Sequence, residues 1–181
     1  MRVMLVCGSL HQASGTRAAL KVAAETIAAS GVQADFYDLG ENRFPLYDPD
    51  ATSMPPAVQD FRERAMAADA FIFGTPEYHG AMSGALKNAL DYIGSRYVRN
   101  KPVGLLACAG GGKGGVNALG NLRTVVRSVS GMAVSEQVVV DEEDFDPQMN
   151  LTNENRRMRI HVLALAVVRY VKLLEMEKAG V

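Results

Sequence analysis

Short apolar runs alternate with helical patterns along the whole chain, and this alternation is the feature that most restricts the fold. Five runs have the length and the β-branched or aromatic content of buried strands. Segments with apolar residues at helical spacing separate them, and crossover helices imply a parallel sheet covered on both faces. The sequence therefore predicts an α/β fold: a flavodoxin-like three-layer sandwich with a five-stranded parallel sheet in the order 2-1-3-4-5.

The expected elements can be placed from the apolar spacing and from the positions of glycine and proline. The expected strands are Val3–Cys7, Ala34–Leu39, Ala70–Gly74, Pro102–Ala109 and Val134–Val140. The expected helices are Thr16–Ser30, Val58–Ala68, Ser83–Ile93, Val116–Ser128 and Asn153–Lys178. We expect a long proline-containing loop over residues 41–56.

Bulk properties restrict the class of protein further. The length of 181 residues indicates one domain over residues 1–181. The net charge of -1 gives no overall field that would attract nucleic acid or an anionic membrane, so we expect neither as a partner. Both cysteines, Cys7 and Cys108, lie inside expected strands, which indicates buried small side chains and a reducing cytoplasm. The longest apolar segment, Ile160–Leu174, is interrupted by Arg169 and Lys172 and falls short of a membrane span.

Three loops follow the first, third and fourth expected strands, and they open at the same edge of a parallel sheet. The first, Gly8–Arg17, supplies hydroxyl groups and runs into a helix N-terminus, which suits a phosphate group. Arg17 and His11 could add positive charge. The alternative is a plain surface loop in which Ser14 or Thr16 caps the helix.

The other two loops suit a flat ring better than an acyl group that reacts with a nucleophile. An apolar run ends at Gly74, and the compact polar loop Thr75–Gly80 follows it. The third loop matches Gly110-x-Gly112-x-x-Gly115, the pattern of dinucleotide-binding proteins. One remaining strand cannot build the second half of such a domain. Glycines still allow a ligand to approach the backbone closely, and the alternative is a flexible surface loop.

At these three loops the sequence resembles a known family. GSLHQASGTR, TPEYHGAMSGALKNALD and AGGGKGGVNALGNLR are similar to the NAD(P)H-dependent FMN reductases, which are flavodoxin-like flavoproteins. The resemblance covers most of the chain and implies FMN as the cofactor and NADPH or NADH as the co-substrate. It implies that the FMN phosphate binds at Ser9, His11, Ser14, Thr16 and Arg17. It implies that the ring binds at Pro76, Glu77, Tyr78, His79, Gly80, Gly110, Gly111 and Gly112.

The chain departs from the family at three of these positions. The family commonly has Arg where this chain has His11, and Asn where it has Thr16 and His79. An imidazole carries a positive charge only when it is protonated. We therefore predict that FMN affinity falls as the pH rises through the titration of His11. His79 is interpreted either as a wall of the ring pocket or, as a sharper hypothesis, as a general acid.

The resemblance implies hydride transfer from the nicotinamide to flavin N5, and then electron release to free flavin, a quinone, an azo dye, a metal oxyanion or another small acceptor. It also implies a homodimer or homotetramer, and no side chain is required as a catalytic base. The alternative is a flavin-binding electron carrier or regulatory flavoprotein without its own NAD(P)H turnover. A carrier is expected to be strongly acidic for docking, and the near-neutral charge favours the enzyme.

Three further features are interpreted as structural. Lys87 and Asp91 lie four residues apart and predict an ordinary helix ion pair. The acidic run 141–144 is interpreted as a solvated loop, because it lacks the spacing of metal ligands. The apolar face of the last helix is expected to cover the sheet and to leave some surface for a dimer interface. The residues expected on that face are Met158, Val162, Leu165, Val168 and Leu173.

Overall fold

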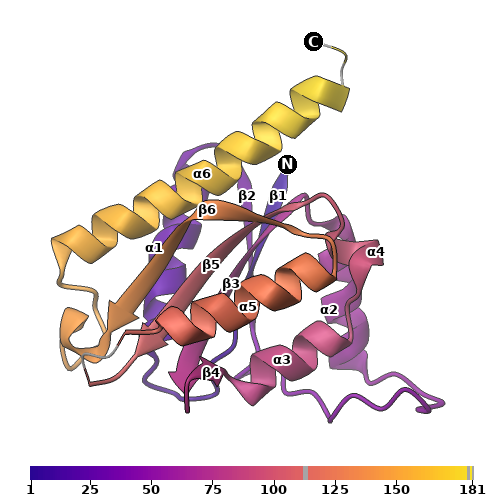
Figure 1. Ribbon diagram of the computed structural model, residues 1–181, viewed down its shortest axis with the longest axis horizontal. Coiled ribbons are helices and arrows are strands. Elements are labelled where there is room, and N and C mark those ends of the chain that lie inside the picture. The colour runs from indigo at the N-terminus through magenta and orange to yellow at the C-terminus, as the bar shows by residue number, and fades with distance from the viewer. Residues whose placement is uncertain (112–113, 179, 181) are drawn as a thin grey trace.

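The computed structural model describes residues 1–111, 114–178 and 180, and its centre is a parallel β-sheet (Figure 1). Five strands run parallel in the order β2-β1-β3-β5-β6, and a short sixth strand, β4, pairs antiparallel with β3. Without β4, this is the predicted flavodoxin-like order. The strands are β1 (Arg2–Cys7), β2 (Gln33–Asp38), β3 (Ala70–Tyr78), β4 (Ala81–Met82), β5 (Pro102–Ala109) and β6 (Met132–Asp141).

Helices cover both faces of the sheet, as Figure 1 shows. One face packs against α1 (Gly15–Ala29) and α6 (Glu154–Lys178). The other packs against α2 (Pro56–Ala67), α3 (Gly84–Asp91), α4 (Ser95–Val98) and α5 (Val116–Ser128). Alternate strand residues serve the two layers, because successive side chains of a strand point to opposite faces. In β3, for example, Phe71 and Phe73 join one core and Ile72 joins the other.

The structure corrects the predicted end of the third strand. β3 continues beyond Gly74 through the segment that was expected to be a loop, and it ends only at Tyr78. Its backbone keeps strand partners there: Thr75 and Pro76 lie opposite β5, and Glu77 and Tyr78 lie opposite β4. Polarity alone suggested a loop, but hydrogen-bonding partners on both sides hold the segment extended. The expected loop reduces to a two-residue turn at His79 and Gly80.

The last helix and the acidic run also differ from expectation. Of the five α6 residues that were expected to cover the sheet, only Val168 is buried, and Met158, Val162, Leu165 and Leu173 are exposed. The other buried residues of α6 are Ile160, Leu163, Ala164, Ala166, Val167 and Val171. Asp144, expected in a solvated loop, is 5% exposed at the end of a 3-10 helix, η1 (Glu142–Asp144). Its carboxylate accepts a 2.6 Å hydrogen bond from the Asn153 side chain and so fixes the start of α6.

The ion pair that was expected in the third helix is present in α3. The Lys87 and Asp91 side chains form an ion pair at 2.7 Å, and both cysteines are free. In that part of the chain, no helix has both the length and the apolar content to cross a bilayer. Nor do His, Cys, Asp and Glu side chains there gather in threes as they would around a metal ion.

Candidate FMN and active site

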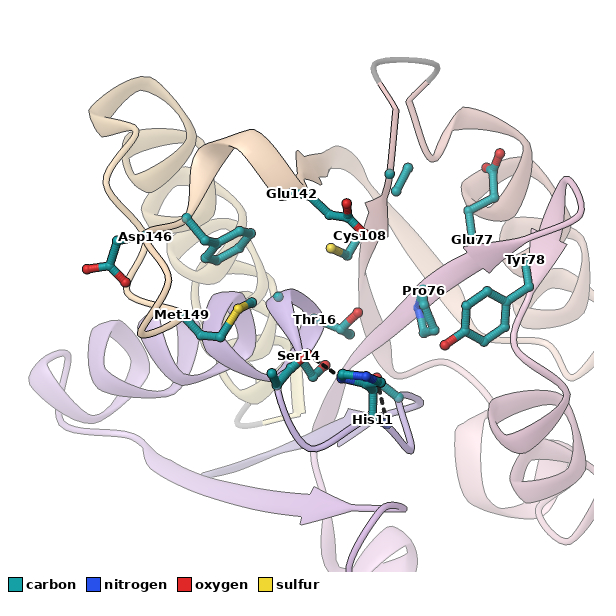
Figure 2. A pocket seen from close by; sticks show the side chains of 16 residues that line it. His11, Ser14, Thr16, Pro76, Glu77, Tyr78, Cys108, Glu142, Asp146 and Met149 are labelled. Atoms are coloured by element: carbon teal, nitrogen blue, oxygen red, sulfur yellow. Dashed lines mark hydrogen bonds between the residues drawn. The ribbon is translucent and has the colours of Figure 1, made fainter.

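A cavity of about 680 Å³ opens at the carboxyl edge of the sheet, where the loops after β1, β3, β5 and β6 meet (Figure 2). This is the edge at which open α/β sheets bind ligands, and the volume suits a cofactor. Eight residues predicted from the sequence line it: Ser9, His11, Ser14, Thr16, Pro76, Glu77, Tyr78 and Gly110. Arg17, His79, Gly80 and Gly111 are not among the lining residues, and Gly112 lies outside the described residues.

The first end of the cavity is formed by hydroxyl side chains at the start of α1. Ser9, Ser14 and Thr16 are 3%, 6% and 1% exposed. Ser14 is the helix N-cap, and its side chain accepts a hydrogen bond from the Arg17 N–H at 3.2 Å. The capping role considered as an alternative is therefore present, and it places the remaining N–H groups of the first turn beside the same cavity. Hydroxyl donors and a helix N-terminus together suit a phosphate group.

His11 lies in the same loop with one ring nitrogen already engaged. Its Nδ1 is 2.6 Å from the carbonyl oxygen of Ala13. A carbonyl only accepts, so Nδ1 carries a proton, and in the neutral ring Nε2 is then an acceptor. Only protonation turns Nε2 into a donor. A phosphate near His11 would therefore gain both a charge and a hydrogen bond when the ring is protonated.

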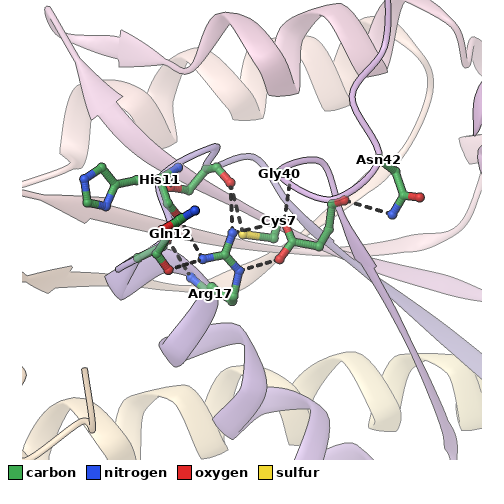
Figure 3. Close-up of polar contacts among 9 residues, drawn as sticks. Cys7, His11, Gln12, Arg17, Gly40 and Asn42 are labelled. Atoms are coloured by element: carbon green, nitrogen blue, oxygen red, sulfur yellow. Dashed lines mark hydrogen bonds and ion pairs between the residues drawn. The ribbon is translucent and has the colours of Figure 1, made fainter. Parts of the chain in front are cut away.

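Arg17 braces this loop from outside the cavity (Figure 3). Its guanidinium pairs with the carboxylate of Asp38 at the end of β2 and donates 2.8 Å hydrogen bonds to the carbonyl oxygens of His11 and Gln12. The hydrogen bond to Asp38 raises the pKa of Arg17. The sequence suggested that Arg17 adds charge to a phosphate, but its placement makes it a support for the loop that carries His11.

The opposite end of the cavity is formed by the β3–β4 hairpin. His79 and Gly80 have φ angles of 53° and 78°, the left-handed values that a tight two-residue hairpin turn requires. Glycine reaches this region freely, and Asn and His are the side-chain-bearing residues enriched there. The family's Asn and this chain's His79 thus share a backbone requirement. Tyr78, just before the turn, is 51% exposed and lies beside the cavity in Figure 2.

Glu77 joins the hairpin to the glycine loop that precedes α5. Its carboxylate accepts a 2.9 Å hydrogen bond from the Ala118 N–H in the first turn of α5. α5 has Gly115 at its N-cap, with no side-chain capping bond of its own. Glu77 therefore supplies the missing acceptor, and its negative charge lies favourably at the positive end of α5. The contact holds the two walls of this end of the cavity together.

Gly110 lies where the third loop meets the cavity. A Cβ added there would stand 2.9 Å from a carboxylate oxygen of Glu142, so the position accepts only glycine without displacement of that side chain. Gly111 follows with a φ of 81°. The third loop is thus shaped for close backbone approach, as its composition suggested.

Sequence reasoning missed the contribution of the loop after β6. Glu142, Phe145, Asp146 and Met149 all line the cavity. In Figure 2, Asp146 and Met149 lie on the side of the cavity away from Tyr78. The signal was available, because β6 ends at the same edge as the other parallel strands. The contribution of this loop was missed because its acidic residues are typical of a solvated surface loop. Among the described lining residues there are three carboxylates and no Lys or Arg.

Cys108 also lines the cavity and was expected to be simply buried. It is partly exposed, and burial of the thiol raises its pKa to about 12, despite a hydrogen bond from Thr16 that acts in the opposite direction. A thiol with such a pKa stays protonated at neutral pH and is a poor nucleophile. The Cys108 thiol therefore lines the cavity but is not expected to react as a nucleophile.

The geometry agrees with the comparison to known families. Residues 1–145 match the sequence model of the NADPH-dependent FMN reductases. The chain belongs to this family. An FMN-dependent NADPH-azoreductase of Staphylococcus haemolyticus (strain JCSC1435) is 35% identical over 185 residues, 94% of this chain and 95% of the relative. The same-named protein of Staphylococcus aureus (strain USA300) is 34% identical, with the same coverage of both chains.

Among solved structures, this FMN reductase is similar to a flavoenzyme NAD(P)H:acceptor oxidoreductase (FerB) from Paracoccus denitrificans. The TM-score is 0.79 at 22% identity, over 94% of this chain and 97% of that one. This likeness supports the flavodoxin-like fold. The family assignment supports an enzyme that takes electrons from NAD(P)H and uses FMN, so the alternative of a carrier without such turnover is not favoured.

The residues present fit the cofactor that the family requires. The cavity has hydroxyls and a helix N-terminus at one end, glycine backbone and an aromatic ring at the other, and sufficient volume between them. Both ends of FMN, one anionic and one flat, therefore have matching surroundings.

Proposed function

We propose that the cavity binds FMN with its phosphate at the β1–α1 loop and its ring between the β3–β4 hairpin and Gly110–Gly111. The observation that carries this proposal is the group of nearly buried hydroxyl residues at the start of α1, Ser9, Ser14 and Thr16. Burial of such groups is favourable only when they are hydrogen-bonded. The hydroxyl oxygens of Ser9 and Ser14 accept backbone hydrogen bonds from His11 and Arg17, so their hydroxyl hydrogens can be donated to a phosphate together with the N–H groups of the first turn of α1.

The redox chemistry that FMN supplies when bound is hydride acceptance from NAD(P)H and electron release to a second substrate. The protein's own part is to bind, orient and tune. Backbone N–H groups of residues 77–80 and of Gly110–Gly111 would donate to the polar edge of the ring, where negative charge develops on reduction. No side chain is assigned as a catalytic acid or base.

We propose a small, flat acceptor, such as a quinone, an azo compound or free flavin. Support comes from the names of the staphylococcal relatives and from exposed apolar side chains near the three edge loops. Leu10, Tyr78 and Val116 are 40%, 51% and 63% exposed. Apolar surface of this kind favours contact with an aromatic molecule.

We further propose that residues 1–181 form one FMN-binding domain that works as a homodimer or homotetramer in the cytoplasm. The exposed apolar residues of α6, Met158, Val162, Leu165 and Leu173, support an association surface, because soluble monomers rarely expose such a group. The free cysteines support a reducing compartment. Sedimentation analysis of the purified protein tests the assembly.

Flavin binding tests the placement of the phosphate. FMN and riboflavin share the ring and ribityl chain and differ in the phosphate. We expect FMN to bind the flavin-free protein at least about a hundred-fold more tightly than riboflavin, since several charge-assisted hydrogen bonds are lost without the phosphate. Fluorescence quenching of the flavin measures both affinities. Equal affinities would show that the phosphate does not bind at the buried hydroxyls.

A further inference from the structure

A second cavity, of about 370 Å³, lies along the outer side of α1 and adjoins the FMN cavity. The two cavities share Ser14 and Met149 as lining residues. The second one, here called the α1 groove, runs between the face of α1 that carries Lys21 and the segment 148–151. Because the lining is shared, one extended ligand could occupy part of each cavity.

The two cavities differ in charge. The described lining of the FMN cavity contains three carboxylates and no Lys or Arg. The α1 groove is lined by three cations, Arg17, Lys21 and Arg157, and by one carboxylate, Glu25. Side-chain amides of Gln12, Gln148 and Asn150 complete its polar lining. The groove therefore favours an anionic group, since its cations outnumber its one carboxylate.

The three cations are not equally available. Arg17 is paired with the carboxylate of Asp38. Arg157 donates a hydrogen bond to the Leu151 carbonyl oxygen, and its Nε lies 3.4 Å from Oε1 of Glu154. Lys21 is exposed, and no ion pair engages it within the described residues. Lys21 is thus the cation with its charge and all three donors free for a ligand. Glu25, one turn further along α1, is the group that opposes an anion there.

We propose that the α1 groove binds the phosphorylated adenosine end of NADPH, with Lys21 contacting its 2′-phosphate, while the nicotinamide reaches past Met149 toward the FMN ring. This inference rests on the proposed function and deepens it, because it names the feature that distinguishes NADPH from NADH. The 2′-phosphate is the only group that differs between the two nucleotides, and it is a dianion. A cationic groove therefore binds NADPH in preference to NADH, because only NADPH carries this additional negative charge.

Two substitutions that are expected to change the affinity for the 2′-phosphate in opposite directions test the proposal. Lys21→Ala removes the attracting charge, and Glu25→Gln removes the opposing one at nearly constant size. We expect the affinity of the FMN-loaded protein for 2′,5′-ADP, measured by titration calorimetry, to fall about five-fold in the first variant and to rise about two-fold in the second. Affinity for 5′-AMP, which lacks the 2′-phosphate, should change less in both. Lys172→Ala, an exposed lysine on α6, is the matched control and should change neither affinity.

Turnover provides the second measurement. The ratio of kcat/KM for NADPH to that for NADH should fall in Lys21→Ala and rise in Glu25→Gln. Unchanged ratios and unchanged 2′,5′-ADP affinity in both variants would overturn the groove proposal, even if the wild type oxidises NADPH rapidly. A wild type that oxidises neither nucleotide would count against the proposed function, and the 2′,5′-ADP titration would still decide whether the groove binds the phosphate.

Discussion

The two ends of the FMN cavity are built on different principles. At the proposed phosphate end, the hydroxyl side chains that line the cavity are nearly buried, and the Arg17–Asp38 pair supports their loop from outside the cavity. At the ring end, the side chains are more exposed and the backbone itself has the special geometry, with positive φ at His79 and Gly80. Such a design lets one end hold a resident cofactor tightly. The other end stays open to two substrates in turn.

The largest expected effect comes from breaking the brace at the phosphate end. In Arg17→Met, the Asp38 side chain, which is only 5% exposed, is left without its partner. We expect a loss of about 3 kcal/mol in the free energy of unfolding, since removing one partner strands a buried charge. Urea denaturation measures it. Lys87→Ala breaks an exposed pair, with side chains 49% and 40% exposed, and should cost less than about 1 kcal/mol. Equal losses in the two variants would contradict the bracing role.

The ring end has a weaker brace, the hydrogen bond from the Ala118 N–H to Glu77. Glu77→Ala should cost about 1–2 kcal/mol in stability and speed amide hydrogen exchange in the first turn of α5, because that N–H loses its acceptor. Glu77→Gln keeps an acceptor oxygen and should stay close to wild type. Equally fast exchange of the Ala118 amide in both variants would show that the negative charge of Glu77, and not its hydrogen bond, stabilises the first turn of α5.

A smaller effect is expected at the hairpin turn. His79→Asn should keep both stability and turnover, because Asn also accepts a positive φ. His79→Val should cost about 1–2 kcal/mol, since a β-branched side chain is strained there. Thermal unfolding and steady-state turnover check both variants. If His79→Asn lost turnover while remaining folded, the imidazole would have a chemical role and the backbone account of this position would be incomplete.

The smallest effect concerns His11 at the phosphate end. Because its Nδ1 proton is directed to the Ala13 carbonyl, only the protonated ring can donate from Nε2. His11→Gln should lower FMN affinity by less than about ten-fold, since the ring is solvent-exposed and a charge on it is screened. Fluorescence quenching of the flavin measures this affinity. A much larger loss would show that the imidazole contributes more than an exposed contact to the phosphate.

Much of the fold was predictable, because apolar runs and helical spacing reflect which faces of the elements are buried. The sheet order and the ligand edge follow from these patterns. The eight cavity residues follow from the resemblance of the three loops to the FMN reductases. The extension of β3 was not predictable from the polar segment, because its extended shape depends on partners in β4 and β5. The Arg17–Asp38 pair depends on strand register across 21 residues, which local patterns do not encode.

The proposed function depends on reduction of the bound FMN by a nicotinamide nucleotide. An anaerobic titration of the FMN-loaded protein with NADPH, followed at the visible flavin absorption band, measures this step. We expect the band to bleach fully with one equivalent of NADPH and to return when a quinone is added. A band that stays unchanged with excess NADPH and excess NADH would contradict it.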